Sequence, residues 1–144
     1  MSEQKDRYDT MPFGELIYII GQNKGKYHQK EADVNLRPHG RFLKHIYYNK
    51  NLSQDDIAEY FHQTKGNVAK GLRKLEDEGY IERKVDPNNR RKYILNTTTK
   101  GDAIIPKMEK VNKKWEDAVG VNDLPPEMIT KLQDIAKKSK DLIN

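Results

Sequence analysis

The hydrophobic spacing of this chain changes between residues 52 and 96, from the 3.6-residue period of helices to the two-residue period of strands. The helical part begins at residues 52–61, where Ser53 can act as an N-cap and Asp56 can complete a capping box. After a short turn, Thr64 can cap a second helix with its own apolar stripe. Two short helices joined by such a turn form a helix-turn-helix.

The part with the two-residue period predicts a β-hairpin directly after these helices. Gly79 would end the second helix, and Ile81 and Val85 then alternate with charged residues. Residues 86–89 have turn chemistry, and residues 93–95 form a second apolar run. Two strands alone are marginal in water, so this hairpin must lean on the preceding helices. The sequence therefore predicts a winged helix-turn-helix.

Helices are expected on both sides of this unit. Residues 11–31 carry apolar side chains on nearly every side, which predicts a helix buried against several neighbours. Pro38 suits the first turn of another helix. A long helix should follow residues 97–99, with a kink or a restart at Pro106. The predicted inward-facing residues of the helix after Pro38 are Phe42, Leu43, Ile46 and Tyr47.

The predicted fold class is mainly α with a small β-hairpin wing. A final helix should begin near residues 123–127. We assign residues 37–96 to the winged helix-turn-helix domain, and residues 1–36 and 97–144 to dimerisation helices. Hydrophobic residues make up only 35% of the 144 residues, so one chain can bury a modest core, and the striped terminal helices favour a homodimer.

Composition excludes several classes of function. No stretch approaches the length of an apolar membrane span and the start lacks a secretory signal, so we expect a cytoplasmic protein without a membrane partner. The absence of cysteine excludes disulfides, thiolate metal sites and cysteine nucleophiles. The histidines lack metal-binding spacing, and no Gly-rich phosphate loop or nucleophile elbow is present. We expect no enzyme, no metal and no cofactor. The histidines are His28, His39, His45 and His62.

Charge is sorted along the second helix of the helix-turn-helix. The net charge of +5 decides little by itself, because small basic proteins are common. On a helical projection, however, the basic residues lie about 140° to 200° from the apolar stripe. The apolar stripe consists of Val68, Leu72 and Leu75. The opposite face consists of Gly66, Lys70 and Arg73, with Gln63, Asn67 and Lys74 at its flanks.

This basic face has two interpretations. Most charge runs are solvated helix surfaces. Against that interpretation, Lys65 lies in the first helical turn, where the helix dipole disfavours a cation, and no acid stands at i−4 or i+4 to Lys70 or Lys74 except Glu78. A bound polyanion would relieve this, and amide groups beside the cations can read base edges. Gly66 either permits close backbone approach to DNA or is a tolerated weak residue.

The predicted DNA-binding residues lie at the start of the first helix, along the second helix and at the hairpin tip. There, the guanidinium groups of Arg90 and Arg91 suit a narrow minor groove. The complete set is Ser53, Gln63, Thr64, Lys65, Gly66, Asn67, Lys70, Arg73, Lys74, Arg90 and Arg91. A weaker cluster near the second predicted helix, formed by Arg37, His39 and Arg41, has an anion site and a plain surface role as alternatives.

About 50 residues carry a family resemblance. The motifs are LSQDDIAEYF at 52–61, LRKLEDEGYIER at 72–83, DPNNRR at 86–91 and TKG at 99–101. Together they resemble MarR-type regulators. The resemblance implies a homodimer that binds a pseudo-palindromic double-stranded operator, with recognition helices in major grooves and wings in minor grooves. It also implies regulation by a small, anionic aromatic effector whose pocket the sequence does not identify.

Two residues depart from the family pattern. Lys70 stands where the family often has a base-contacting arginine, and lysine lacks the bidentate fork. Asn89 stands where an acid would orient the wing arginine, which leaves open whether Arg90 or Arg91 enters the groove. The leading hypothesis is a dimeric, sequence-specific repressor that responds to a ligand. The alternative is a non-specific architectural or adaptor DNA-binding protein.

Overall fold

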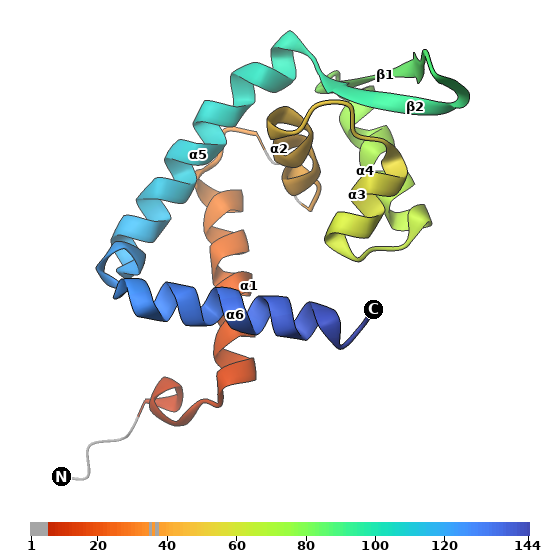
Figure 1. Cartoon of the computed structure of the whole chain (residues 1–144). Helices are drawn as coiled ribbons and strands as arrows, with labels where there is room; N and C mark the ends of the chain where they lie inside the picture. Colours follow the sequence, from red (N-terminus) through yellow and green to blue (C-terminus); the bar gives the residue numbers. More distant parts are fainter. Residues whose placement is uncertain (1–5, 35, 37) are drawn as a thin grey trace, which may run out of the picture. The chain divides into compact units, whose positions relative to one another are not determined.

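The computed structural model describes residues 6–34, 36 and 38–144 (Figure 1). The chain divides into two compact units, one that ends at Val111 and one from Asn112 to Asn144. The elements are η1 (Arg7–Thr10), α1 (Phe13–Glu31), α2 (Gly40–Tyr48), α3 (Gln54–Phe61), α4 (Lys65–Asp77), β1 (Ile81–Asp86), β2 (Asn89–Thr97), α5 (Thr99–Val119), η2 (Val121–Asp123) and α6 (Pro126–Asp141). The predicted fold class, mainly helical with one antiparallel hairpin, is confirmed.

The helix-turn-helix is built from α3 and α4, as the caps predicted. The Ser53 hydroxyl accepts a hydrogen bond from the Asp56 amide at 3.2 Å, and the Asp56 carboxylate accepts one from the Ser53 amide at 2.8 Å. Thr64 caps α4 by accepting from the Asn67 amide at 3.2 Å. The chain leaves α4 at Gly79, whose φ of +81° favours glycine. Local sequence therefore fixes both helices at their ends.

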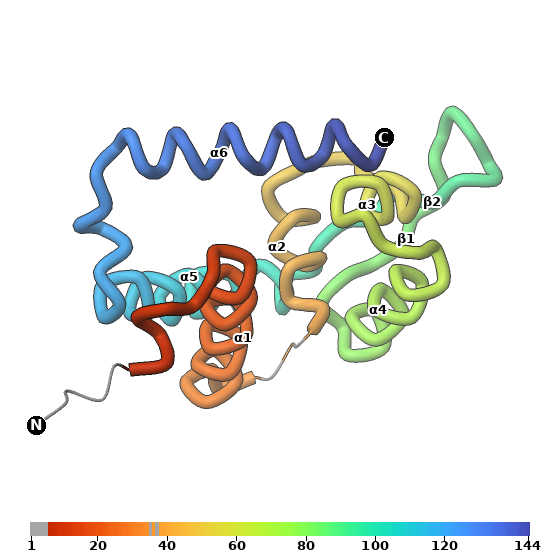
Figure 2. The backbone as a smooth tube through the Cα atoms, turned by 90° about the horizontal axis from the view of Figure 1, so that it is seen from below, coloured from red at the N-terminus to blue at the C-terminus, as the bar shows by residue number. Residues whose placement is uncertain are grey.

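The hairpin of β1 and β2 lies against these helices and extends beyond them (Figures 1 and 2). Its strands pair in antiparallel register, with Ile81 opposite Thr97 and an irregularity next to Asp86. The Leu95 amide of β2 also donates to the Leu52 carbonyl at 2.8 Å, just before α3. This additional backbone bridge joins the base of the hairpin to the helix-turn-helix. Two isolated strands are only marginally stable, so the hairpin needs such a support.

A single core holds α2, α3, α4, the hairpin base and the start of α5 together. Of the predicted face of α2, three residues are buried and Tyr47 is half-buried against the core. Pro38 precedes α2, which begins at Gly40, so the prediction that Pro38 lies in its first turn was wrong by two residues. The core consists of Leu36, Phe42, Leu43, Ile46, Ile57, Ala58, Val68, Leu72, Leu75, Tyr80, Ile81, Leu95, Ile104 and Ile105.

Two further helix predictions need correction. The expectation that the first helix is buried against several neighbours was wrong for a single chain, because no described side chain of α1 is buried and Tyr18 is 65% exposed. The alternative that the long helix restarts at Pro106 was also wrong, since α5 runs through this residue without a break. Ile104 and Ile105, both buried, anchor the preceding turn to the core and offset the hydrogen bond that proline cannot make.

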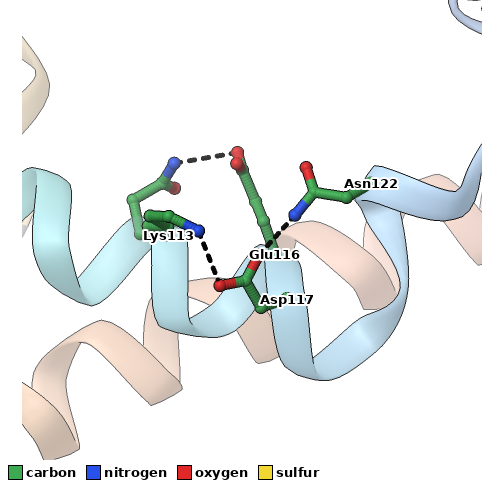
Figure 3. A network of polar contacts seen from close by, with 5 residues as sticks. Lys113, Glu116, Asp117 and Asn122 are labelled. Atoms are coloured by element: carbon green, nitrogen blue, oxygen red, sulfur yellow. Dashed lines mark hydrogen bonds and ion pairs between the residues drawn. The ribbon is translucent and has the colours of Figure 1, made fainter.

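The C-terminal unit contains the end of α5, η2 and α6. Lys113 donates to the Asp117 carboxylate at 2.8 Å, and Asn122 donates to the other oxygen of Asp117 from η2 (Figure 3). The same carboxylate thus ties the last turn of α5 to the following turn, and it raises the pKa of Lys113. Pro126 then begins α6, as predicted for a proline in a first helical turn. Among the described residues, no helix combines the length and apolarity needed to cross a bilayer.

Candidate nucleic-acid interface

Helix α4 presents one buried and one basic face, as the sequence predicted. Val68, Leu72 and Leu75 are at most 1% exposed and anchor the helix to the core. The predicted residues of the other face are all exposed. These residues are Lys65, Gly66, Asn67, Lys70, Arg73 and Lys74. The core therefore fixes the orientation in which α4 offers its cations and amide to the outside.

Most of these cations have no counter-charge among the residues that the structure describes. Lys70, Arg73 and Lys74 form no ion pair with any described residue. Lys65 does have one, because the Asp55 carboxylate of α3 lies 3.7 Å from its ammonium nitrogen. This ion pair joins two helices, so spacing along α4 alone gives no sign of it. Both side chains are exposed, and such surface pairs contribute little.

Residues at the start of the helix-turn-helix are less free. The Ser53 hydroxyl accepts from the Asp56 amide and also lies 3.0 Å from the Asp56 carboxylate, so capping uses both its acceptor and its donor. Thr64 is exposed, and its hydroxyl proton remains available because capping uses only the oxygen as an acceptor. Gln63 is half-buried in the turn, where its backbone N–H donates to the Ala58 carbonyl at 3.1 Å.

The hairpin tip places Arg90 and Arg91 at the start of β2, both exposed. Neither forms an ion pair with a described residue. The amide oxygen of Asn89 accepts from the Arg91 backbone N–H at 3.1 Å, and Asp86 accepts from the Asn88 N–H at 2.8 Å. Asn89 thus shapes the turn backbone rather than orienting a guanidinium group, which leaves both arginine side chains free to reach outward.

His39 packs against α4. A side chain at Gly71 of α4 would meet its ring, with the nearest approach 2.6 Å, so glycine permits this packing. Burial lowers the pKa of His39, and the positive charges of Lys74 and Lys70 lower it further. Of the weaker predicted anion cluster, Arg41 lies over the Phe61 ring at 5.5 Å and Arg37 is outside the described residues.

A pocket of about 200 Å³ opens between the start of α3 and the hairpin. Three cations line it, of which the sequence predicted only Arg91 as a site residue. The sequence contains a signal for Arg83, because strand alternation places it on the same face of β1 as the buried Ile81. In the structure, the Arg83 Nε atom lies 2.6 Å from the Glu76 carboxylate. The lining residues are Ser53, Gln54, Asp55, Arg83, Arg91, Lys92, Tyr93 and Leu95.

The four histidines do not take part in a metal-binding cluster among the described residues. Among the described residues, no group of three or more histidine, aspartate or glutamate side chains is arranged to hold an ion. His45 stacks on Tyr60 with ring centroids 3.9 Å apart, and burial lowers its pKa. These contacts are those of packed surface histidines.

Comparison with known proteins agrees with this architecture. Residues 37–93 match the sequence model of the MarR family. The HTH-type transcriptional regulator BilQ of Clostridioides difficile (strain CD3) is 28% identical over 118 residues, 78% of this chain and 79% of that protein. A crystal structure of MarR is 32% identical, with a TM-score of 0.74 over 96% of this chain and 93% of that one. A crystal structure of the MepR–DNA complex of S. aureus shares the fold, with a TM-score of 0.75 at 22% identity over 91% of this chain and 98% of that one.

These relatives are regulators rather than enzymes, in agreement with the sequence prediction. The match includes both helices of the helix-turn-helix and most of the hairpin. The similarity to the MarR structure covers nearly the whole chain, and its sequence identity of 32% indicates common ancestry as well as a common fold. This chain belongs to the MarR family of DNA-binding transcriptional regulators.

Proposed function

We propose that the chain acts as a homodimeric repressor that reads a pseudo-palindromic operator and releases it when a small anionic effector binds. The observation that carries this proposal is the basic face of α4, which is exposed, almost free of ion pairs and held in place by a buried opposite face. A polyanion is the partner that such a surface fits. We expect the protein to act in the cytoplasm, where a repressor meets its operator.

The side chains divide by chemistry into base-reading and phosphate-binding groups. Asn67 and Gln63 can exchange hydrogen bonds with base edges, and Lys70, near the middle of α4, can donate to guanine. The remaining residues would bind phosphates and set the register. These are Thr64, Lys65, Arg73 and Lys74, with Gly66 permitting close approach, while Ser53, whose hydroxyl is engaged by Asp56, would fix the start of α3 beside the DNA. Arg90 and Arg91 would enter the minor groove beside each half-site.

The exposed apolar side chains of the terminal helices support a dimer. Ile17 and Ile20 of α1, and Met128 and Ile135 of α6, are each at least 40% exposed within one chain. Such residues are normally covered when they share a helix face. We therefore assign residues 1–36 and 97–144 to dimerisation and residues 37–96 to DNA binding, in agreement with a single-chain core that holds only part of the apolar side chains.

Selection from a pool of random duplexes tests sequence-specific binding. The wild-type protein should enrich a pseudo-palindrome whose half-sites lie about 10 base pairs apart. Competition at several salt concentrations should then show that this duplex binds at least about 1,000-fold more tightly than random DNA. A steep salt dependence without any preference would instead identify the non-specific architectural protein.

A pair of lysine variants tests the face itself. Lys70→Ala should reduce the preference for the selected duplex, since one base contact is worth about 1–3 kcal/mol of discrimination. Lys107→Ala is the matched control, because Lys107 is exposed on α5 and makes no ion pair with a described residue. An equal effect of both substitutions would show that only total charge matters.

The pocket between α3 and the hairpin is our candidate for the effector site. Its volume of about 200 Å³ suits a small molecule, Arg83 and Lys92 can bind an anion, and Tyr93 and Leu95 can contact an aromatic ring. A ligand there would act only if it binds the DNA-free state more tightly than the DNA-bound state. Hydroxybenzoates should release the selected duplex, and Lys92→Met should raise the concentration needed while Lys84→Met does not. No release at any concentration would reject this site for that class of effector.

A further inference from the structure

The C-terminal end of α4 is held by the segment that begins α5. The last carbonyls of a helix have no partner within the helix. Here three consecutive carbonyls, of the C-cap residue Glu78 and of Gly79 and Tyr80 directly after it, accept hydrogen bonds from Thr98 and Lys100. The Lys100 ammonium donates to Glu78 at 2.6 Å, the Thr98 hydroxyl to Gly79 at 2.6 Å and the Thr98 amide to Tyr80 at 3.1 Å.

The same segment is packed closely against the side chain and the backbone of Tyr80. The Lys100 nitrogen lies 4.5 Å above the centre of the Tyr80 ring, which is 4% exposed. A Cβ atom at Gly101 would lie 2.1 Å from the Tyr80 carbonyl oxygen, so glycine allows the two backbones to touch. Lys100 also places a positive charge at the negative end of the α4 dipole, an arrangement that stabilises the helix terminus.

One residue serves both helices at this joint. The Thr98 hydroxyl that donates to Gly79 also accepts from the Gly101 amide at 3.1 Å and so caps the start of α5. The end of α4 and the beginning of α5 therefore share a hydrogen-bond network, and neither can tilt without breaking bonds to the other. We refer to Thr98, Lys100 and Gly101 as the α4–α5 joint.

We propose that Thr98 and Lys100 are positioning residues for DNA specificity, because they fix the angle between α4 and α5. This inference rests on the proposed function, in which α5 belongs to the dimer and each α4 reads one half-site. Two half-sites are read together only if both helices keep their angle, whereas phosphate contacts tolerate a tilt. A loosened joint therefore lowers specific binding more than non-specific binding.

Three variants separate this role from charge and from stability. Lys100→Met keeps the aliphatic stem and removes the ammonium group, Lys100→Arg keeps the charge, and Lys107→Met removes an exposed charge elsewhere on α5. Each variant is measured as the full chain, at a temperature where circular dichroism shows it to be folded. The first readout is hydrogen exchange at the Thr98 amide, which donates to the Tyr80 carbonyl, and at the Gly101 amide, which donates to the Thr98 hydroxyl. The second is the ratio of affinity for the selected duplex to affinity for random duplex.

The joint predicts faster exchange at these amides in Lys100→Met only. It also predicts that the affinity ratio of this variant falls by about fivefold, the lower end of typical coupling between sites. Lys100→Arg should restore most of both properties, and Lys107→Met should change both affinities by a similar factor and leave their ratio unchanged. Unchanged exchange would overturn the joint, and faster exchange with an unchanged ratio would overturn its role in specificity. If the wild-type protein selects no duplex, the proposed function fails and the specificity role falls with it, whereas exchange still decides whether the joint exists.

Discussion

Replacement of Gly66 by alanine should make the free protein more stable and the DNA complex weaker. Gly66 is the second residue of α4, and a Cβ atom there would meet nothing within 4 Å in the free chain. A glycine-to-alanine change inside a helix gains about 0.5–1 kcal/mol, and a position in the first turn should lie at the lower end. Urea denaturation of the variant should therefore show a small increase in the free energy of unfolding.

The same methyl group should hinder DNA if Gly66 touches the phosphate backbone. An added methyl in a closely packed contact costs about 1–3 kcal/mol, which corresponds to about 5- to 150-fold in affinity. Gly14→Ala is the matched control, because Gly14 is the second residue of α1 and its Cβ would also meet nothing within 4 Å. Fluorescence anisotropy with the selected duplex measures the affinity. If both variants bind DNA as tightly as the wild type, Gly66 is a tolerated weak residue and the close-approach reasoning is wrong.

Three further predictions concern the hairpin, a histidine and two glycines. Replacing both Arg90 and Arg91 by alanine should weaken all duplexes alike and reduce the salt dependence of binding by about one ion per lost phosphate contact, measured by salt titration; a loss confined to the selected duplex would argue for base reading. Because the pKa of folded His39 is lowered from 6.5, the unfolded chain takes up the proton first as pH falls, so stability should decrease below pH 6.5. His39→Gln should reduce this decrease in denaturation curves, and an identical pH dependence would reject the assignment. Gly79→Ala should cost about 1–2 kcal/mol through its positive φ, and Gly101→Ala should cost more because its Cβ would overlap a carbonyl; urea denaturation in the reverse order would contradict the packing described.

Much of the DNA-binding region was predictable because its signals are local. Ser53 and Thr64 cap residues three positions away, and Gly79 ends α4 through its own backbone conformation. The buried and exposed faces of α4 follow from helical periodicity alone. Each of these features depends on residues within about one helical turn, a distance over which sequence spacing determines geometry.

The errors came from features that span the chain or need a second one. The apolar residues of α1 were expected to be buried, but none is fully buried within one chain. Composition cannot say whether a neighbour belongs to the same chain or to another copy. One alternative for Pro106 was a restart of the helix, but α5 runs through this residue, where the adjacent isoleucines are buried in the core. Local propensity was overruled by packing in this second case.

By itself, the sequence determined the two capped helices, the hairpin and the basic face of α4, because short-range hydrogen bonding and periodicity govern them. Only the tertiary structure decided which distant residues meet. It brought Asp55 to Lys65, placed Arg83 in the pocket beside α3, and set Lys100 on the carbonyl of Glu78, 22 positions earlier. Contacts of this kind depend on how the core folds the chain back on itself, and no spacing rule along one helix or strand encodes them.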